Sequence, residues 1–369
     1  MTGAVPVARR QLLSEPAKLV VAVVAVAAAV ALVLLLTGLR RGMGEQVTTY
    51  LDRQPPVVVA QAGTRGFLSQ TSILDAPTVS RVAAVPGVAD AAPITQGYAM
   101  LGLHGERVLT LLVGYDLGRR GGPWALAAGR EPRARGELVL DRVLADEHGL
   151  AVGSTLRFRG ARLAIVGLSK GTSGFMTPLA FTTRATANAL NEQPPTANFV
   201  LVTPAPGVAA GTLVDRLRRL PGVAAAPRDE LAARDRSLFV GAFSGPLLAM
   251  IVIAAAVAVL VIALTVYTST RDRAREYATL KAIGLRRRAL LRLVAAQAGA
   301  LAVIGTGLGL VLALAAARGV AELAPKYLIA LAASDTLLMA IAAVVFALLA
   351  GLAPARYLAN LDPASAYRR

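Results

Sequence analysis

The chain has 369 residues, of which 55% are hydrophobic, and its mean hydropathy of +0.58 is too high for a water-soluble domain. The formal net charge is +17, but aromatic residues make up only 5% and the basic residues are not gathered in one patch, which argues against nucleic-acid binding. The absence of cysteine excludes disulfides and thiol chemistry, and two histidines leave little for a metal site. The composition therefore predicts an integral membrane protein.

The first apolar run, 19–36, contains no charged residue and is, with its flanks, long enough to cross a hydrocarbon layer of ~30 Å. A cleavable signal peptide is the alternative, since alanine and valine dominate the run and two arginines precede it. Against cleavage, the run exceeds the ~7 to 15 residues of a signal core, and Arg40 follows it closely. We therefore predict a membrane span over 19–39 and a cytoplasmic segment over 1–18.

Residues 40–236 have the composition of a globular domain, with their charges spread along the sequence. Two stretches, 80–93 and 215–228, each indicate a helix that ends at Pro-Gly-Val and leads into a strand. Such a pair indicates a split α+β module whose halves pack side by side around an insertion. Long translocated domains largely escape the positive-inside rule, so we predict that 40–236 is one extracytoplasmic domain.

Four short runs inside this domain predict strands, at 137–140, 155–158, 163–166 and 179–182. The stretch 167–176, Gly-Leu-Ser-Lys-Gly-Thr-Ser-Gly-Phe-Met, is rich in glycine and serine. It lacks the Gly-Lys-Ser/Thr ending of a Walker A phosphate loop, and no helix clearly follows it. We interpret it as a flexible loop, with contact to a ligand or partner as the alternative.

The second apolar run, 237–268, would be ~48 Å long as a helix, which exceeds a bilayer, so we predict an outward stalk joined to a second span. Pro246 marks the place where this helix is expected to kink. The third run, 289–317, carries Gly305 and Gly309, a small-xxx-small pair that permits close helix contact. Its one amide, Gln297, indicates an interhelical hydrogen bond, with a transport site as the alternative.

A short outer loop, 318–334, is predicted before a fourth span at 335–353 and a cytoplasmic tail at 354–369. Each terminal tail carries a net charge of +2, the loop between the second and third spans is strongly basic, and the outer loop, counted to Asp335, is neutral. Because short basic loops are retained on the inner side, this asymmetry predicts a multi-pass cell-membrane protein with four spans and both termini in the cytoplasm.

The cytoplasmic loop at 269–288 is strongly basic for its length. From Arg271 to Arg292 there are eight basic residues against two acidic ones. As a helix, 271–284 has an apolar stripe at three-residue steps and a C-terminal stop at Gly284; the stripe is Ala274, Tyr277, Leu280 and Ile283. Such a helix either lies on the membrane surface, with its arginines on lipid phosphates, or docks on a protein.

Two motifs resemble those of a known family. RAREYATLKAIG at 273–284 resembles the signature that follows the second span in FtsX-like permeases, and PARYLANLDPASAYRR at 354–369 resembles the family's C-terminal ending, with Asp-Pro after the last span. The chain is therefore similar to an FtsX-like permease of a MacB-type (type VII) ABC transporter. Its layout is most similar to DevC- and MacB-like export permeases.

The resemblance implies an α-helical membrane protein with four transmembrane helices. Between helices 1 and 2 it implies a large α+β extracytoplasmic domain, a split porter-like module with a β-rich insertion at about 122–191. It also implies a non-catalytic subunit, because a separate cytoplasmic ABC ATPase binds ATP and magnesium and this chain holds no cofactor. The docking residues that it implies on the coupling helix are Arg273, Glu276, Tyr277, Leu280, Lys281, Ile283 and Gly284.

The sequence contains no Walker A motif, no Gly-x-Ser-x-Gly nucleophile and no recognisable carboxylate pair, and its apolar runs hold essentially no charge. By the resemblance, we expect a converter of motion that pairs with a second, identical or different permease chain and exports or extracts a lipid, lipoprotein, peptide or other amphiphile. Membrane lipids are expected partners, and a periplasmic or cell-wall partner is left open. Two alternatives remain: a scaffold that regulates a cell-wall hydrolase, and a membrane-anchored receptor or sensor.

Overall fold

The chain divides into two compact units in the computed structural model, and each is described by itself. The helical unit comprises 1–42, 243–324 and 328–369, and the sheet unit comprises 43–242 and 325–327. The residues that the structure describes are 16–70, 72–103, 105–174, 177–192, 194–272, 287–334, 336–338, 340–342 and 345.

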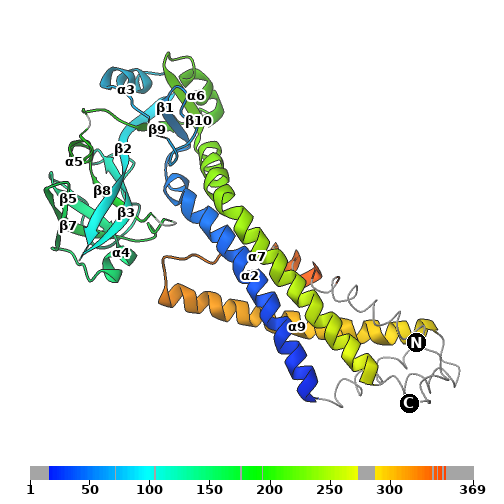
Figure 1. Cartoon of the computed structure of the whole chain (residues 1–369). Coiled ribbons are helices and arrows are strands. Elements are labelled where there is room, and N and C mark those ends of the chain that lie inside the picture. The colour runs from blue at the N-terminus through cyan, green and yellow to red at the C-terminus, as the bar shows by residue number, and fades with distance from the viewer. Residues whose placement is uncertain are drawn as a thin grey trace, which may run out of the picture. The chain divides into compact units, whose positions relative to one another are not determined.

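Three long helices build the described part of the helical unit: α2 (Pro16–Asp52), α7 (Arg228–Asp272) and α9 (Arg287–Leu323) (Figure 1). Within the described residues, these are the helices long and apolar enough to cross a membrane. Both α2 and α7 extend past this unit, since 43–52 and 228–242 belong to the sheet unit. The predicted fourth span, 335–353, lies mostly outside the described residues.

Helix α7 is a single helix of 45 residues, although Pro246 lies inside it. At ~1.5 Å per residue it is roughly 68 Å long, well beyond the thickness of a bilayer. This length agrees with the predicted stalk that continues into the second span. Its apolar side chains, among them Val252, Ile253 and Leu260, are largely exposed in the single chain, as expected where lipid or another membrane helix covers them.

Glycines of α9 form its contact with α2. A Cβ atom built on Gly305 would lie 2.6 Å from Val26 Cγ1, and one built on Gly309 would lie 2.8 Å from the carbonyl oxygen of Ala27. By contrast, a Cβ on Gly307 would meet no atom within 4 Å. The structure therefore places Gly305 and Gly309 on the face of α9 that packs against α2, where the absence of side chains lets the two backbones approach.

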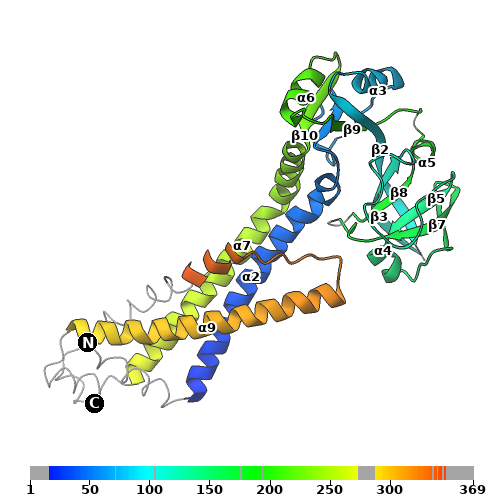
Figure 2. The same ribbon diagram turned by 180° about the vertical axis from the view of Figure 1, so that it is seen from behind.

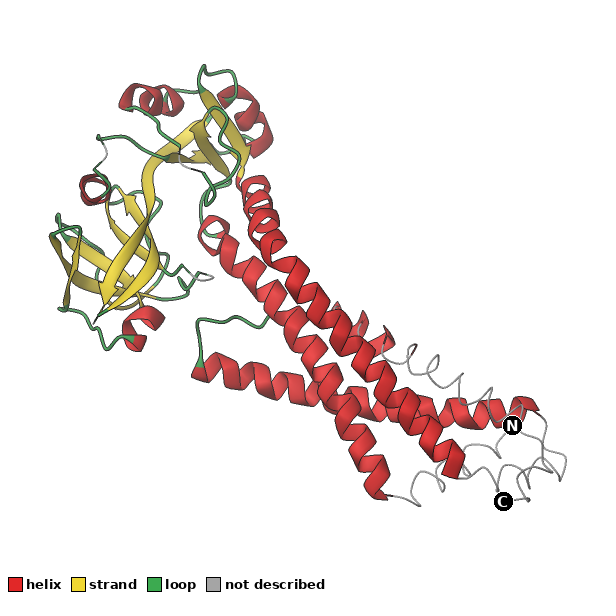
Figure 3. Cartoon of the chain, viewed as in Figure 1, coloured by secondary structure: helices red, strands yellow, loops and turns green. Residues whose placement is uncertain are grey.

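All strands of the described residues lie in the sheet unit (Figure 3). One part of this unit is a four-stranded antiparallel sheet in the order β10–β1–β9–β2. Figures 1 and 2 show two helices on the same side of it, and their apolar residues share a core with β1 and β9. The elements are β1 (Val57–Gln61), α3 (Ala76–Ala83), β2 (Val88–Leu103), β9 (Phe199–Pro204), α6 (Ala210–Leu217) and β10 (Val223–Pro227).

The two predicted helix–turn–strand repeats are confirmed as elements, α3 followed by β2 and α6 followed by β10. Each helix packs apolar residues on the sheet. Val82 from α3, and Leu213 and Leu217 from α6, are fully buried. At the first turn, Gly87 has a φ of +100°, a conformation that favours glycine over residues with a Cβ atom.

The other part of the sheet unit is a closed barrel. Its six strands follow the order β2–β3–β8–β5–β7–β6, and β6 returns to β2 through the pair Arg157 and Gly102. Figure 1 shows β2 passing from the four-stranded sheet into the barrel. The further elements are β3 (Glu106–Tyr115), β4 (Leu126–Gly129), β5 (Glu137–Asp141), α4 (Arg142–Glu147), β6 (Thr155–Phe158), β7 (Ala161–Ser169), β8 (Leu179–Thr183) and α5 (Arg184–Leu190).

All four strands predicted within 137–182 are present, as β5, β6, β7 and β8. The barrel also uses β3 and the second half of β2, so it includes residues that precede 122, where the insertion was expected to begin. Leu101, Leu138, Leu156 and Leu163 are among the buried residues that fill its interior. Closure leaves β2 and β6 without free edges where they pair, which protects them from pairing with other chains.

A charged turn closes the start of β5. The Arg130 guanidinium donates two hydrogen bonds to the Glu137 carboxylate, at 2.7 and 2.6 Å, and the backbone N–H of Arg133 donates a third at 2.6 Å. The hydrogen bonds from Arg130, followed by the one from the Arg133 backbone, lower the pKa of Glu137 from 4.5 to about 2. Glu137 is therefore ionised over the whole physiological range.

Replacing Glu137 with glutamine is expected to destabilise the barrel at neutral pH and to reduce its sensitivity to acid. Because the pKa in the folded state lies below its usual value, the stabilisation is complete above about pH 4.5 and is lost as the pH falls towards 2. Thermal unfolding of the full chain in detergent between pH 7 and pH 3 measures both effects. Glu192→Gln, at a side chain that is 84% exposed, is the control; equal behaviour of the two variants would contradict the account.

Candidate functional site

The predicted docking residues 273–284 lie outside the described residues, as does the side chain of Gln297 on α9. The structure does describe the helices on either side of this segment, because α7 ends at Asp272 and α9 begins at Arg287. The N-terminal turns of α7, at the opposite end of this helix, belong to the sheet unit. Their contacts within that unit form the candidate site.

An arginine of α7 binds the end of α2. The Arg236 guanidinium donates hydrogen bonds to the carbonyl oxygen of Gly44, at 3.2 Å, and to the hydroxyl of Thr48, at 3.1 Å. The Thr48 hydroxyl in turn donates to the Asp52 carboxylate at 2.7 Å. These contacts hold the last turns of α2 beside the first turns of α7, within the sheet unit.

The neighbouring residue, Asp235, holds a loop of the sheet unit. Its carboxylate is 1% exposed and accepts hydrogen bonds from the backbone N–H groups of Phe67, at 2.9 Å, and Leu68, at 3.0 Å. The Phe67 ring stacks on Tyr50 of α2, with 5.2 Å between ring centroids, and packs against Phe199 of β9 at 4.7 Å. One loop therefore joins α7, α2 and the four-stranded sheet.

A glutamine of α2 joins two further segments. The Gln46 side chain donates to the carbonyl oxygen of Lys326, at 2.8 Å, and to that of Ser173, at 3.3 Å. The Lys326 ammonium group lies 3.2 Å from the Glu147 carboxylate at the end of α4. Residues 325–327, which follow α9 in the chain, are thus bound to the sheet unit through both backbone and side chain.

Asp141 fixes the loop that reaches Gln46. It is 1% exposed, caps α4 by accepting from the Leu144 N–H, and also accepts from the hydroxyls of Thr172 at 2.6 Å and Ser173 at 3.0 Å. Residues 167–169 belong to β7, so the prediction that 167–176 is a flexible loop is wrong for them, because they extend the barrel wall. The hydroxyl groups of Thr172 and Ser173 in this stretch bind the protein's own Asp141 carboxylate.

Replacing Asp141 with alanine is expected to lower the free energy of unfolding by about 2–4 kcal/mol, because it removes a helix cap and leaves the buried Thr172 hydroxyl and the half-buried Ser173 hydroxyl without this acceptor. Asp146→Ala is the matched control on the same helix: this side chain is 62% exposed and lies 3.7 Å from Arg142. Its loss is expected to cost below about 0.5 kcal/mol. Denaturant unfolding of the full chain in detergent compares the two, and similar losses would show that Asp141 has no special role.

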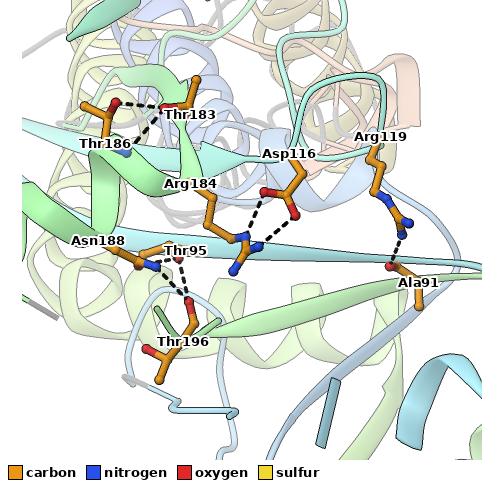
Figure 4. Close-up of polar contacts among 9 residues, drawn as sticks. All are labelled: Ala91, Thr95, Asp116, Arg119, Thr183, Arg184, Thr186, Asn188 and Thr196. Atoms are coloured by element: carbon orange, nitrogen blue, oxygen red, sulfur yellow. Dashed lines mark hydrogen bonds and ion pairs between the residues drawn. The ribbon is translucent and has the colours of Figure 1, made fainter. Parts of the chain in front are cut away.

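Polar contacts also join the barrel to the four-stranded sheet (Figure 4). Arg184 of α5 forms a two-pronged ion pair with Asp116 after β3, with both distances 2.9 Å. Asn188 accepts from the Thr95 hydroxyl on β2 at 2.8 Å and donates to the carbonyl oxygen of Thr196 at 3.1 Å. Paired forks of this kind fix orientation as well as distance, so Arg184 fixes α5 on the end of β3, and Asn188 ties α5 to β2 and to the segment before β9.

The arrangement is suited to holding segments together rather than to covalent chemistry. Each of its carboxylates binds a backbone N–H group, a hydroxyl, a guanidinium group or an ammonium group, although the Oδ1 atom of Asp235 has no hydrogen-bond partner in the described part of the chain. Within the described residues, no group of three or more histidine, aspartate or glutamate side chains is placed to hold a metal ion. No sequence motif marks Gln46, Asp141, Asp235 or Arg236 as functional.

Two family models match the chain in succession. Residues 19–220 match the model described as MacB-like periplasmic core domain, and 248–363 match the model described as FtsX-like permease C-terminal. The chain belongs to the MacB-type, FtsX-like permeases of ABC transporters. The recognition made from the two sequence motifs is thereby confirmed, and the sheet unit of the permease is a MacB-like domain with a mixed sheet and helices.

The permease is also similar to individual proteins. The permease is 27% identical, over 95% of both chains, to uncharacterized ABC transporter permeases of Mycobacterium tuberculosis strains CDC 1551 and H37Rv. The periplasmic region of MacB from Actinobacillus actinomycetemcomitans has 13% identity and a TM-score of 0.37, over 52% of the permease and 94% of that chain. The extracellular domain of the noncanonic ABC-type transporter YknZ from Gram-positive bacteria has 11% identity and a TM-score of 0.35, over 46% and 98%.

Proposed function

We propose that the permease transmits the ATP-driven motion of a separate cytoplasmic ATPase to its sheet unit, and thereby exports or extracts a lipid, lipoprotein, peptide or other amphiphile. The observation that carries the proposal is the match of 248–363 to the FtsX-like permease C-terminal model, because this match spans a short, strongly basic segment, 271–288, between the end of α7 and the start of α9. In this proposal the ATPase binds that segment on the cytoplasmic side of the cell membrane, and both termini lie on the same side.

Helix α7 supports such a role because one continuous helix carries both kinds of contact. Its C-terminal end, Asp272, adjoins the proposed docking segment, and its N-terminal turns hold Asp235 and Arg236, which bind the 67–68 loop and α2. A stiff helix transmits a displacement along its axis without needing a chain of separate contacts. In the proposal, closure of two ATPases moves two permease chains, and the driving energy is the difference in ATPase contacts between the two states.

Co-purification tests the proposal. Affinity capture of the full-length permease from its native membrane is expected to bring down an ATP-hydrolysing chain in a stable complex. A substitution that blocks ATP hydrolysis in that chain is expected to abolish release of the exported amphiphile. A permease that is recovered fully active without a nucleotide-hydrolysing companion would refute the proposal. Recovery of a cell-wall hydrolase bound to the sheet unit, with no amphiphile released, would retain the ATPase coupling and overturn the assignment of cargo.

A further inference from the structure

The outer wall of the barrel carries a row of arginines. In the strand register, Gly102 of β2 lies opposite Arg107 of β3 on one side and opposite Arg157 of β6 on the other, and Arg157 lies opposite Arg162 of β7. Directly opposed residues of antiparallel strands project to the same face. All four positions are exposed, whereas the strand neighbours Leu101, Leu103, Leu156 and Leu163 are buried in the barrel core. Three guanidinium groups are thus gathered across four adjacent strands.

These three arginines have no carboxylate partner in the described part of the chain, whereas several other charged side chains of the barrel are paired. Arg130 binds Glu137, Arg159 lies near Glu192, and the adjacent acidic residue, Glu106, lies 3.3 Å from a ring nitrogen of His148. Like charges on adjacent strands oppose one another and destabilise the sheet slightly unless an anion lies between them. The row is therefore a surface with positive charge left for an external partner.

An apolar strip adjoins the arginine row on the same wall. Two residues further along each strand, Met100 of β2 lies opposite Leu109 of β3, and these side chains are 49% and 39% exposed. Tyr98, the next outward residue of β2, is 42% exposed. A two-residue step along a strand is about 7 Å, so the strip begins within one side-chain length of the arginines. Adjacent exposed apolar residues mark a surface that binds something.

Gly102 leaves a recess in the middle of the row. A Cβ atom built there would meet no atom within 4 Å, so the space above its backbone is open. Its two neighbours across the strands are Arg107 and Arg157, each at a Cα distance of about 4.5–5.5 Å in antiparallel pairing. Two guanidinium groups can therefore converge over this glycine from opposite sides, and their fork of N–H donors matches the oxygens of a phosphate or carboxylate.

We propose that this wall binds an amphiphile with an anionic, phosphate-type headgroup. The headgroup lies over Gly102 between the arginines, and the hydrocarbon part lies along Tyr98, Met100 and Leu109. The inference rests on the proposed function, in which the sheet unit handles an amphiphilic cargo, and it specifies the charge of that cargo and the surface that receives it. An acidic protein would satisfy the arginines alone, whereas the contiguous apolar strip calls for a partner that is anionic at one end and apolar along the other.

Binding of a small amphiphile to the full-length permease tests the inference. The probe is dodecyl phosphate with a fluorescent group at its chain end, titrated below its critical micelle concentration in an uncharged detergent and followed by anisotropy. The variant R107Q/R157Q/R162Q is expected to bind it about 30-fold or more weakly, since each lost charge-assisted contact weakens binding severalfold. The matched control R120Q/R135Q/R219Q, at three exposed arginines elsewhere in the sheet unit, is expected to stay within about twofold of the unchanged chain.

Two further variants separate the parts of the site. Gly102→Glu adds a carboxylate where the structure has open space, so the fold is expected to be retained. The added negative charge is expected to lower the affinity for the anionic probe as much as the loss of the three arginines does. Met100→Ser with Leu109→Ser is expected to weaken the probe about tenfold, because its hydrocarbon loses apolar contact. A matched dodecyl phosphocholine probe is expected to bind more weakly than dodecyl phosphate and to be insensitive to the arginine substitutions.

Several outcomes would overturn the inference. One is that the arginine variant and the unchanged chain bind dodecyl phosphate equally well. Another is that the unchanged chain binds dodecyl phosphocholine as tightly as dodecyl phosphate. A third is that inorganic phosphate displaces the probe at the same concentration as dodecyl phosphate does, which would make the site a plain anion site. The measurement requires neither the ATPase nor transport. If the permease binds the probe but is not coupled to an ATPase, only the proposed function is refuted. If the permease does not bind the probe but releases its amphiphile normally, only this site is refuted.

Discussion

Replacing Gly309 with leucine is expected to prevent the permease from folding to its native helical unit. A Cβ atom at this position would already lie 2.8 Å from the carbonyl oxygen of Ala27 and 2.9 Å from Val30 Cβ. Neither of these atoms can move away easily, since one belongs to the backbone and the other is the branch point of a β-branched side chain. The two helices must therefore separate, which removes the packing that holds them together in a membrane.

The matched control for this change is Gly307→Leu on the same helix. It adds the same side chain and the same helix propensity, but it points to space where no atom lies within 4 Å. Overpacking at Gly309 is expected to cost more than about 3 kcal/mol, and the control less than about 1 kcal/mol. Yield of monodisperse protein and thermal unfolding in detergent measure both. Equal loss in the two variants would mean that α2 and α9 do not pack through this face.

Introducing aspartate at Leu280 is expected to uncouple the permease from its ATPase. In a helical 271–284 segment Leu280 belongs to the apolar stripe that the proposal buries against the ATPase, together with Tyr277 and Ile283. Burying a carboxylate without a partner costs several kcal/mol, so the affinity for the ATPase is expected to fall on the order of 100-fold or more.

Ala282→Asp provides the control, because residue 282 lies on the opposite face of such a helix and receives the same charge. Pull-down of the ATPase and amphiphile-dependent ATP hydrolysis are measured for both variants. The account requires loss of both signals in Leu280→Asp and their retention in Ala282→Asp. Normal ATPase binding by Leu280→Asp, or equal loss in the two variants, would remove the stripe from the docking surface.

Local features of the fold could be predicted because short stretches of sequence determine them. The repeated Pro-Gly-Val turns located α3–β2 and α6–β10, and alternating apolar residues located β5 to β8. The family also followed from sequence, since its motifs are contiguous. In each case the signal and the structure it specifies lie within about a dozen residues, the range over which periodicity and turn chemistry act.

Closure of the barrel was not predictable in the same way. It depends on a single pairing, Gly102 with Arg157, between residues far apart in the sequence. Nothing local distinguishes Gly102 from a turn glycine, and the arginines around it are scattered over three strands. Three of the chain's arginines are brought together here on one wall, and only the strand register reveals this.

The contacts at the ends of α2 and α7 were missed for a related reason. Asp235 and Arg236 precede the second apolar run and look in the sequence like an exposed, charged helix start. Asp235 is nevertheless 1% exposed, and it accepts two backbone hydrogen bonds from a loop 167–168 residues earlier in the chain. Gln46 lies four residues before Tyr50, and Thr48 lies four residues before Asp52. Polar residues recurring at this spacing beyond the end of a membrane span were the one available signal that α2 continues as a helix with partners.

Cysteine accessibility at position 278 tests the central claim most directly, namely that the 271–288 segment lies in the cytoplasm where an ATPase can bind it. The chain contains no cysteine, so Ala278→Cys creates a unique label site without other changes. A membrane-impermeant maleimide is expected to label it in inverted membrane vesicles but not in intact cells, and addition of the ATPase is expected to protect it. Labelling in intact cells would place the segment outside and contradict the account.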